Sequence, residues 1–461
     1  MSTIESNWEH VLKVRNDRTP RKLKVALDGE RTTIADADKN FTIANLREQI
    51  EPWLTALFQS EHLSLLTGAG LSYAVHGLAT DEKYPGMNKQ KFGVFDKEID
   101  AVALESAKAA MRGTPNIEDQ IRVANDLLRG LNIYVSDKAK PHEEKKLREK
   151  CESLSNDIQR VLKEFAGAML QAEQRMANGK AQEAFGCLLN FLLSFASRSA
   201  TSERLHIFTT NYDRVIELGA EIAGLRLLDR FIGNLCPIFR SSRLDVDMHY
   251  NPPGIRGEPR YLEGVTHFTK LHGSLDWAYH DRYVRRFALP FGATELEKYL
   301  PTHGETSYDV RQLMIYPNSA KDRETTEYPY VELFRDFAAA VCRPNSTLVV
   351  YGYSFGDEHI NRVIEDMMTL SSTHLVIIAY EDTGNRIKAL YERVNRPAQF
   401  TLLIGNHFGD FKILIDNYLP KPAIDKTTIR MAELLKARMI YTEADSKKNK
   451  NNNYEEGENE K

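Results

Sequence analysis

The sequence predicts an α/β fold, with a mostly parallel β-sheet, helices on both faces and a largely helical insertion. Two observations lead to this expectation. Short apolar runs, each followed by polar turn residues, alternate with helical stretches in the second half of the chain. A block in the first half instead has apolar residues spaced three and four apart, which is typical of amphipathic helices.

The N-terminal part introduces the first strand of the sheet. Residues 1–45 are polar and mixed, with one possible short strand, KLKVAL (22–27), and could form an assembly or partner arm. A helix is expected over about residues 43–59. HLSLLTGAGLS (62–72) is typical of a buried strand that runs into a glycine turn. We expect one large domain over residues 46–420, with a helical insertion inside it.

The helical insertion is expected over residues 98–200. NIEDQIRVANDLLRGL (116–131) has the helical spacing, and a longer stretch from Leu147 to Met169 repeats it. After the insertion, strands and helices alternate. The expected strands are LHIFTTN (205–211), HFTKLHG (267–273), STLVVYGYS (346–354), HLVIIAY (374–380) and QFTLLIGN (399–406). A C-terminal helix (421–442) and a disordered tail (443–461) are expected to follow.

Composition restricts the classes of function. The chain has 461 residues and a formal net charge of -4, which gives no electrostatic basis for direct nucleic-acid binding. Its four cysteines form no C-x-x-C pair, which disfavours structural zinc and a disulfide framework and fits a cytoplasmic location. No apolar segment is long enough for a membrane span, so no membrane role is expected.

Ligands of an open α/β sheet bind in the crevice outside the carboxyl ends of its strands. Polar or glycine-rich residues follow four of the expected strands. They are Thr67–Ser72, Thr209–Asp213, His272–Ser274 and Tyr353–Asp357. Each alone is a weak signal, since polar loops are common there. Together they predict a nucleotide site with catalytic groups.

TGAGLS (67–72) has the features of a diphosphate-binding turn. Gly68 and Gly70 would let the backbone approach phosphate, and the following helix N-terminus would offer amide groups and a favourable dipole. The complete G-x-G-x-x-G pattern is absent, because position 73 is Tyr. An ordinary strand-to-helix turn is the alternative for this motif taken alone.

Three side chains are candidates for chemistry. His272 precedes Gly273 at a strand end, where its imidazole could take a proton near neutral pH, although a structural role is the alternative. Asn211 can both donate and accept hydrogen bonds, so it could orient a water or a ribose hydroxyl. Asp213 could accept from a ligand amide or could cap the following helix, and the sequence leaves both readings open.

These motifs, in this order, resemble those of sirtuins. TGAGLS, TTNYD, KLHGS and YGYSFGD correspond to the phosphate turn, the T-Q-N-x-D strand end, the catalytic H-G and the loop near the adenosine ribose, over roughly residues 60–410. The resemblance implies a Rossmann-like fold that binds NAD+. The chain departs from the deacylases in lacking the two C-x-x-C pairs of their zinc ribbon. It also has GLATDEKYPGM (77–87) in place of their G-I-P-D-F-R segment.

TTNYD, NIEDQI, KLHGSLDW and GYSFGDEHINRVI are similar to bacterial sirtuin-like antiviral effectors, which hydrolyse NAD+ to ADP-ribose and nicotinamide when a phage is sensed. Among these, the pattern resembles the stand-alone type that works with a HerA-type hexameric ATPase. Relatives with a fused sensor carry an extra domain, for which the roughly fifty residues after Asp410 are expected to be too few. The resemblance implies a cytoplasmic homo-oligomer whose partner is encoded nearby.

The resemblance also implies roles for individual residues. Asn211 and His272 would be catalytic, positioning the ribose and water and accepting a proton. Residues that would contact NAD+ are Gly68, Ala69, Gly70, Ser72, Thr210, Asp213, Gly352, Ser354 and Asp357. No metal is expected, since the nicotinamide leaving group is already a cationic pyridinium. The alternatives are an NAD-dependent protein deacylase or ADP-ribosyltransferase, and a non-catalytic NAD-binding sensor or scaffold.

Overall fold

The computed structural model describes residues 10–421, apart from 16, 29–30, 37–38, 110–112, 137–140, 198–202, 243–245, 251–259, 281, 301–312 and 314–327. The chain divides into two units, residues 1–419 and 420–461, and the helices and strands described belong to the first. The expected C-terminal helix and tail lie outside the described residues.

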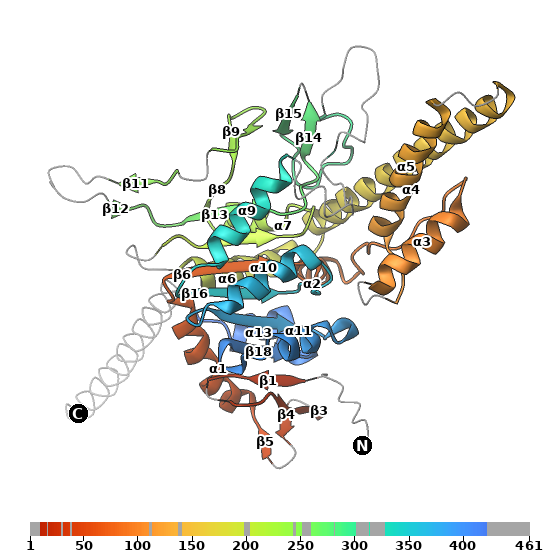
Figure 1. Cartoon of the computed structure of the whole chain (residues 1–461). Coiled ribbons are helices and arrows are strands. Elements are labelled where there is room, and N and C mark those ends of the chain that lie inside the picture. The colour runs from red at the N-terminus through yellow and green to blue at the C-terminus, as the bar shows by residue number, and fades with distance from the viewer. Residues whose placement is uncertain are drawn as a thin grey trace, which may run out of the picture. The chain divides into compact units, whose positions relative to one another are not determined.

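A mixed, mostly parallel sheet forms the centre of the first unit (Figure 1). Within the described residues it has nine strands in the order β2-β1-β18-β17-β16-β6-β7-β13-β8. Their bounds are β1 Val11–Lys13, β2 Arg21–Lys22, β6 His62–Thr67, β7 His206–Thr209, β8 Arg226–Leu228, β13 Val265–Lys270, β16 Ser346–Tyr351, β17 His374–Ala379 and β18 Phe400–Ile404. The apolar runs of the sequence therefore form the strands that were expected of them.

The direction of the chain through the sheet creates a crevice between β6 and β16. From β6 the chain moves to β7 and on to β13 on one side, and it later returns to β16, β17 and β18 on the other. All neighbouring strands from β18 to β8 are parallel. The carboxyl ends of β6 and β16 thus meet at a topological switch point, the usual ligand position in such sheets.

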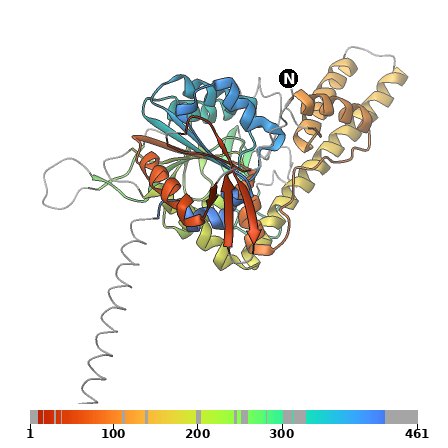
Figure 2. The ribbon, with the colours of Figure 1, turned by 90° about the horizontal axis from the view of Figure 1, so that it is seen from below.

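Helices cover both faces of the sheet, as the sequence predicts (Figures 1 and 2). Leu65 and Val349 belong to one buried cluster, whereas their neighbours Leu66 and Val350 belong to the other, because successive strand residues point to opposite faces. One cluster includes residues of α1 Ile43–Phe58, α2 Ala69–Thr80, α6 Ala181–Ala196, α7 Val215–Ile222, α12 Asn406–Gly409 and α13 Phe411–Asn417. The other includes residues of α9 Tyr330–Val341, α10 Glu358–Thr369 and α11 Arg386–Val394.

The insertion is helical, as expected, and α3, α4 and α5 extend to one side of the sheet (Figures 1 and 2). Its helices are α3 Asp96–Ala109, α4 Ile117–Ser136, α5 Pro141–Asn178 and the sheet-packed α6. A third buried cluster joins Ile121 of α4 and Ile158 of α5 to Tyr212, next to the candidate site. The apolar faces of α4 and α5 thus pack partly against the segment that carries the candidate site.

β3 Lys24–Asp28 confirms the possible strand at KLKVAL (22–27), whereas most of the other short strands were not predicted from the sequence. β1 pairs with β18 in antiparallel orientation, so the N-terminal segment extends the main sheet. Smaller sheets contain β3 Lys24–Asp28, β4 Arg31–Asp36 and β5 Lys39–Phe41; β9 Phe231–Ile232, β10 Ile238–Phe239, β14 Trp277–His280 and β15 Tyr283–Arg286; and β11 His249–Tyr250 with β12 Arg260–Tyr261. Two 3₁₀ turns, Thr383–Asn385 and Pro397–Gln399, precede α11 and β18. Among the described helices, none is both long and apolar enough to cross a membrane.

Candidate active site

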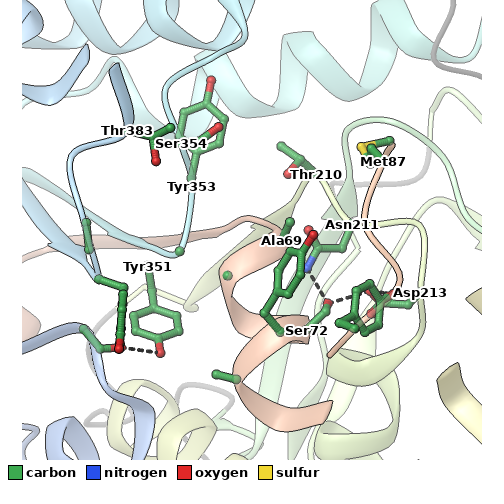
Figure 3. A pocket seen from close by; sticks show the side chains of 18 of the residues that line it. Ala69, Ser72, Met87, Thr210, Asn211, Asp213, Tyr351, Tyr353, Ser354 and Thr383 are labelled. Carbon is green, nitrogen blue, oxygen red and sulfur yellow. Dashed lines mark hydrogen bonds between the residues drawn. The ribbon is translucent and has the colours of Figure 1, made fainter. Parts of the chain in front are cut away.

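A cavity of about 750 Å³ opens at the carboxyl ends of the parallel strands (Figure 3). This volume lies within the range of roughly 300–1,000 Å³ that is usual for small-molecule sites. Every residue predicted for the site lines the cavity except Gly68. Those that line it are Ala69, Gly70, Ser72, Thr210, Asn211, Asp213, His272, Gly352, Ser354 and Asp357. The fold therefore brings together four motifs that lie far apart in the sequence.

The glycine turn packs closely against the loop that follows β16. The backbone N–H groups of Gly68 and Gly70 donate to the carbonyls of Tyr351 and Gly352, at 3.1 and 2.9 Å. A Cβ added at Gly68 would lie 2.6 Å from Tyr353 Cα, and one added at Gly70 would lie 2.6 Å from Gly352 Cα. The sequence predicts that these glycines serve the approach of phosphate. In the structure they allow two loops to approach each other, and both amide groups already bond to protein.

Phosphate could still be held by the start of α2. Ala69 and Gly70 are its first residues, and both line the cavity. The partial positive charge of a helix N-terminus favours an anion at such a position.

Asn211 follows β7, and its amide is fixed by the protein. Its Nδ2 donates to the carbonyl oxygen of Gly68 and to Oγ of Ser72, both at 2.9 Å. Because the Gly68 carbonyl can only accept, the NH₂ group must face it, and the orientation of the amide is defined. Both amide hydrogens are then engaged, so Oδ1 is the Asn211 atom that can meet a ligand, as an acceptor. The residue is 8% exposed.

Asp213 supports this arrangement through a hydrogen bond to Ser72 (Figure 3). Its Oδ2 accepts from Ser72 Oγ at 2.5 Å and from the Tyr84 hydroxyl at 3.0 Å. Its Oδ1 accepts from the N–H of Val215, the first residue of α7, at 3.2 Å. Burial, followed by the charge of Asp213, raises the pKa of Tyr84 well above its usual value, so the phenol remains a donor. The sequence leaves open whether Asp213 contacts a ligand or caps the following helix. The hydrogen bond to the first residue of α7 is present, and Asp213 also lines the cavity.

His272 lies just beyond the end of β13 and is partly exposed to the cavity. Its Nε2 lies 3.0 Å from Oδ2 of Asp357, whose side chain is 6% exposed against 20% for the imidazole. Asp357 is also the N-cap of α10, where its Oδ1 accepts from the His359 N–H at 2.9 Å. The structure thus pairs a predicted catalytic residue with a residue that the sequence analysis grouped with the NAD+ contacts.

One wall of the cavity comes from segments that were not predicted as site residues. Tyr84, Pro85 and Met87 belong to the GLATDEKYPGM stretch, and Asn116 and Glu118 begin the NIEDQI stretch. The Tyr212 hydroxyl donates to Glu118 Oε1 at 3.3 Å, which links this wall to the strand end that carries Asn211. Both stretches stand out in the sequence, one as a departure from the sirtuin pattern and one as a match to the effectors, and that signal could have identified the wall.

The opposite end of the cavity is lined by polar and charged side chains. Thr383 and Ser354 lie away from Asn211 and Asp213 in Figure 3. Glu381 follows β17, and Arg386 begins α11, where its Nε donates to the Thr383 carbonyl at 2.8 Å. This end therefore presents hydroxyl, carboxylate and guanidinium groups to a ligand.

A buried ion pair joins the insertion to the site. Arg214 follows Asp213 directly, and its guanidinium pairs with Glu173 of α5, with side-chain exposures of 7% and 0%. Glu173 Oε1 also accepts from the Arg214 backbone N–H at 2.9 Å. The helical insertion thus helps to hold the strand end that carries Asn211. In the described part of the chain, no cluster of three or more His, Cys, Asp or Glu side chains is arranged to hold a metal ion.

Part of the sequence that forms this cavity matches a known protein family. Residues 205–396 match the SIR2-like domain family. The matched region runs from the strand before Asn211 through His272 and Ser354 to the end of α11, while the glycine turn and the helical insertion lie outside it. No curated protein matches the chain. Residues 205–396, which carry Asn211, His272 and Ser354, are therefore similar to a SIR2-like domain.

Proposed function

We propose that the chain is an NAD+ glycohydrolase, which cleaves NAD+ to ADP-ribose and nicotinamide. The observation that carries the proposal is the fixed amide of Asn211, placed in one cavity with His272 inside a SIR2-like domain. An NAD-binding scaffold would need neither an acceptor with a defined direction nor a histidine beside it.

The reaction uses Asn211 Oδ1 and His272. The oxygen of Asn211 accepts from a ribose hydroxyl or from the attacking water and so holds it in place. The water oxygen forms a bond to C1′ of the nicotinamide ribose through an oxocarbenium-like transition state. The C1′–N bond breaks, and its electron pair returns to the pyridinium ring, which leaves as neutral nicotinamide. His272 takes the proton of the water, an effect of roughly 10²–10⁴-fold in rate.

The two ends of the cavity fit the two ends of the dinucleotide. The wall that contains Tyr84 and Glu118 faces the Asn211 end, where nicotinamide would lie. The Ser354 and Arg386 end would receive the adenosine half, with the diphosphate near the start of α2. In this arrangement Asp213 acts mainly by holding Ser72 and Tyr84, because its oxygens are already engaged there.

We also propose that the hydrolase is a bacterial antiviral effector that depletes cellular NAD+ on phage infection. The resemblance of TTNYD, NIEDQI and KLHGSLDW to such effectors supports this role. It also supports a cytoplasmic homo-oligomer with a HerA-type ATPase as partner. Activity would then depend on assembly, and NAD+ loss should be greater with the neighbouring gene's product than without it.

The test measures NAD+ loss by the wild type, Asn211→Ala and His272→Ala, with and without that partner. Asn417→Ala, at the last residue of α13, is the matched control because it deletes an amide that does not line the cavity. The proposal predicts that both cavity variants are inactive and that the control is active. Equal rates for all four proteins would contradict it. Nicotinamide release only with an acyl-lysine peptide would indicate a deacylase, and saturable NAD+ binding without turnover would indicate a scaffold.

A further inference from the structure

The carboxylate of Asp357 connects the start of α10 to the imidazole of His272. One oxygen, Oδ1, accepts from the backbone N–H of His359 at 2.9 Å, and the other, Oδ2, lies 3.0 Å from His272 Nε2. A helix N-cap has little freedom to rotate, because its side chain satisfies an amide of the first turn. The oxygen that faces His272 is therefore held in a defined place.

The backbone of Asp357 is fixed as well. The Tyr353 hydroxyl accepts from the Asp357 N–H at 3.2 Å and lies 3.1 Å from the Asp357 carbonyl, to which it donates. Burial raises the pKa of Tyr353 well above its usual value, so this hydroxyl stays protonated. Both the main chain and the side chain of Asp357 are thus anchored independently of His272.

The imidazole has two aromatic neighbours, Tyr212 in the segment between β7 and α7 and Phe334 of α9. Its ring centroid lies 6.3 Å from that of Tyr212 and 6.5 Å from that of Phe334. An ionised carboxylate can only accept hydrogen bonds, so the His272 nitrogen that faces Asp357 must carry a hydrogen. In the neutral ring, Nδ1 is then the nitrogen with the lone pair.

We propose that Asp357 is the positioning residue of His272: it sets the Nε2–H tautomer and leaves Nδ1 to receive the proton. The inference rests on the proposed function, in which His272 is the base. It gives Asp357 a task different from NAD+ contact, and it explains why the motif GYSFGD ends in an acidic residue.

Asp357→Asn tests the assignment, because asparagine is also a good N-cap. The amide oxygen would keep the bond from the His359 N–H, so the NH₂ group would face His272 and donate to Nε2. The hydrogen of the neutral ring would then move to Nδ1, the wrong nitrogen for proton uptake. We expect kcat to fall by roughly 10²–10⁴-fold, with little change in KM, since Asp357 acts through His272.

The tautomer is measured directly by ¹⁵N NMR of histidine-labelled protein, with His272→Gln used to assign the signal. Inversion from Nε2–H to Nδ1–H in Asp357→Asn, together with the loss in kcat, supports the proposal. The same tautomer in both proteins, or an unchanged kcat, overturns it. Thr42→Ala removes a different N-cap, that of α1, and should leave both readouts unchanged. If the wild type hydrolyses no NAD+ under any condition, the proposed function fails, and the NMR result alone decides the role of Asp357.

Discussion

Replacing Gly70 by alanine separates two explanations of the glycine turn. If glycine serves only the approach of phosphate, Gly70→Ala should weaken NAD+ binding without loss of stability. In the structure, however, the new Cβ would lie 2.6 Å from Gly352 Cα and 2.9 Å from the Gly352 carbonyl oxygen. Carbon atoms in contact normally lie about 3.5–4.0 Å apart. The two loops would therefore have to separate by roughly 1 Å.

The expected change in stability follows from this overlap. Overpacking of this kind costs about 1–3 kcal/mol, and the obstacle here is backbone, which cannot rotate away. Because backbone cannot rotate away, the upper end of this range, about 3 kcal/mol, applies. The better helix propensity of alanine offsets about 1 kcal/mol, so the expected net loss is about 2 kcal/mol. Gly186→Ala in α6 is the matched control, because no atom lies within 4 Å of its added Cβ. That variant should gain about 0.5–1 kcal/mol.

Urea unfolding followed by circular dichroism measures both variants against the wild type. The midpoint should fall for Gly70→Ala and rise slightly for Gly186→Ala. If Gly70→Ala is at least as stable as the wild type and only its NAD+ binding is weaker, the close contact between the two loops is refuted.

Three further predictions concern stability and are checked by the same unfolding measurement. Tyr84→Phe removes a hydroxyl that donates to Asp213 and should lower the free energy of unfolding by about 1–2 kcal/mol; no change would show that this bond is dispensable. Glu173→Gln leaves its buried partner Arg214 without a counter-charge and should lower the free energy of unfolding by about 3 kcal/mol or more. Glu164→Gln breaks an exposed pair with Arg160 and should lower it by less than about 1 kcal/mol. Equal losses would contradict the burial argument. Burial, and to a smaller extent the positive charge of Lys13, lowers the pKa of His374 to about 4. The free energy of unfolding should therefore fall by up to ~3 kcal/mol as the pH drops from about 6.5 to about 4. The sign follows because only the unfolded chain takes up the proton in that window, and His374→Gln should flatten the curve.

The strands and the polar residues at their ends could be predicted because their signals are local. A run such as LSLL before TGAG shows both the buried strand and the turn. β1 was missed because its three residues, VLK, end in a lysine. Lys13 is nevertheless fully buried, and its Nζ donates to the Phe400 carbonyl at 3.2 Å, a partner that lies far along the chain.

The internal organisation of the site could not be predicted from local patterns. That Asn211 uses its NH₂ group on Gly68 and Ser72 depends on the spacing of β6 and β7, which no motif states. The pairing of His272 with Asp357 likewise joins positions 85 residues apart. The sequence indicates which residues reach the cavity, and tertiary structure decides which atoms remain available to a ligand.

The central claim is that the NH₂ group of Asn211, bonded to Gly68 and Ser72, fixes Oδ1 as the acceptor for the reacting end of NAD+. The most direct measurement quantifies nicotinamide and ADP-ribose released from NAD+ by the wild type and by Asn211→Asp, in the presence of the neighbouring gene's product and without any acyl-lysine substrate. Aspartate has the same shape, but it would place an oxygen against the Gly68 carbonyl. The account predicts equal amounts of the two products from the wild type and a loss of at least about 10²-fold in the variant. Equal rates from both proteins, or wild-type release only after acyl-lysine is added, would contradict it.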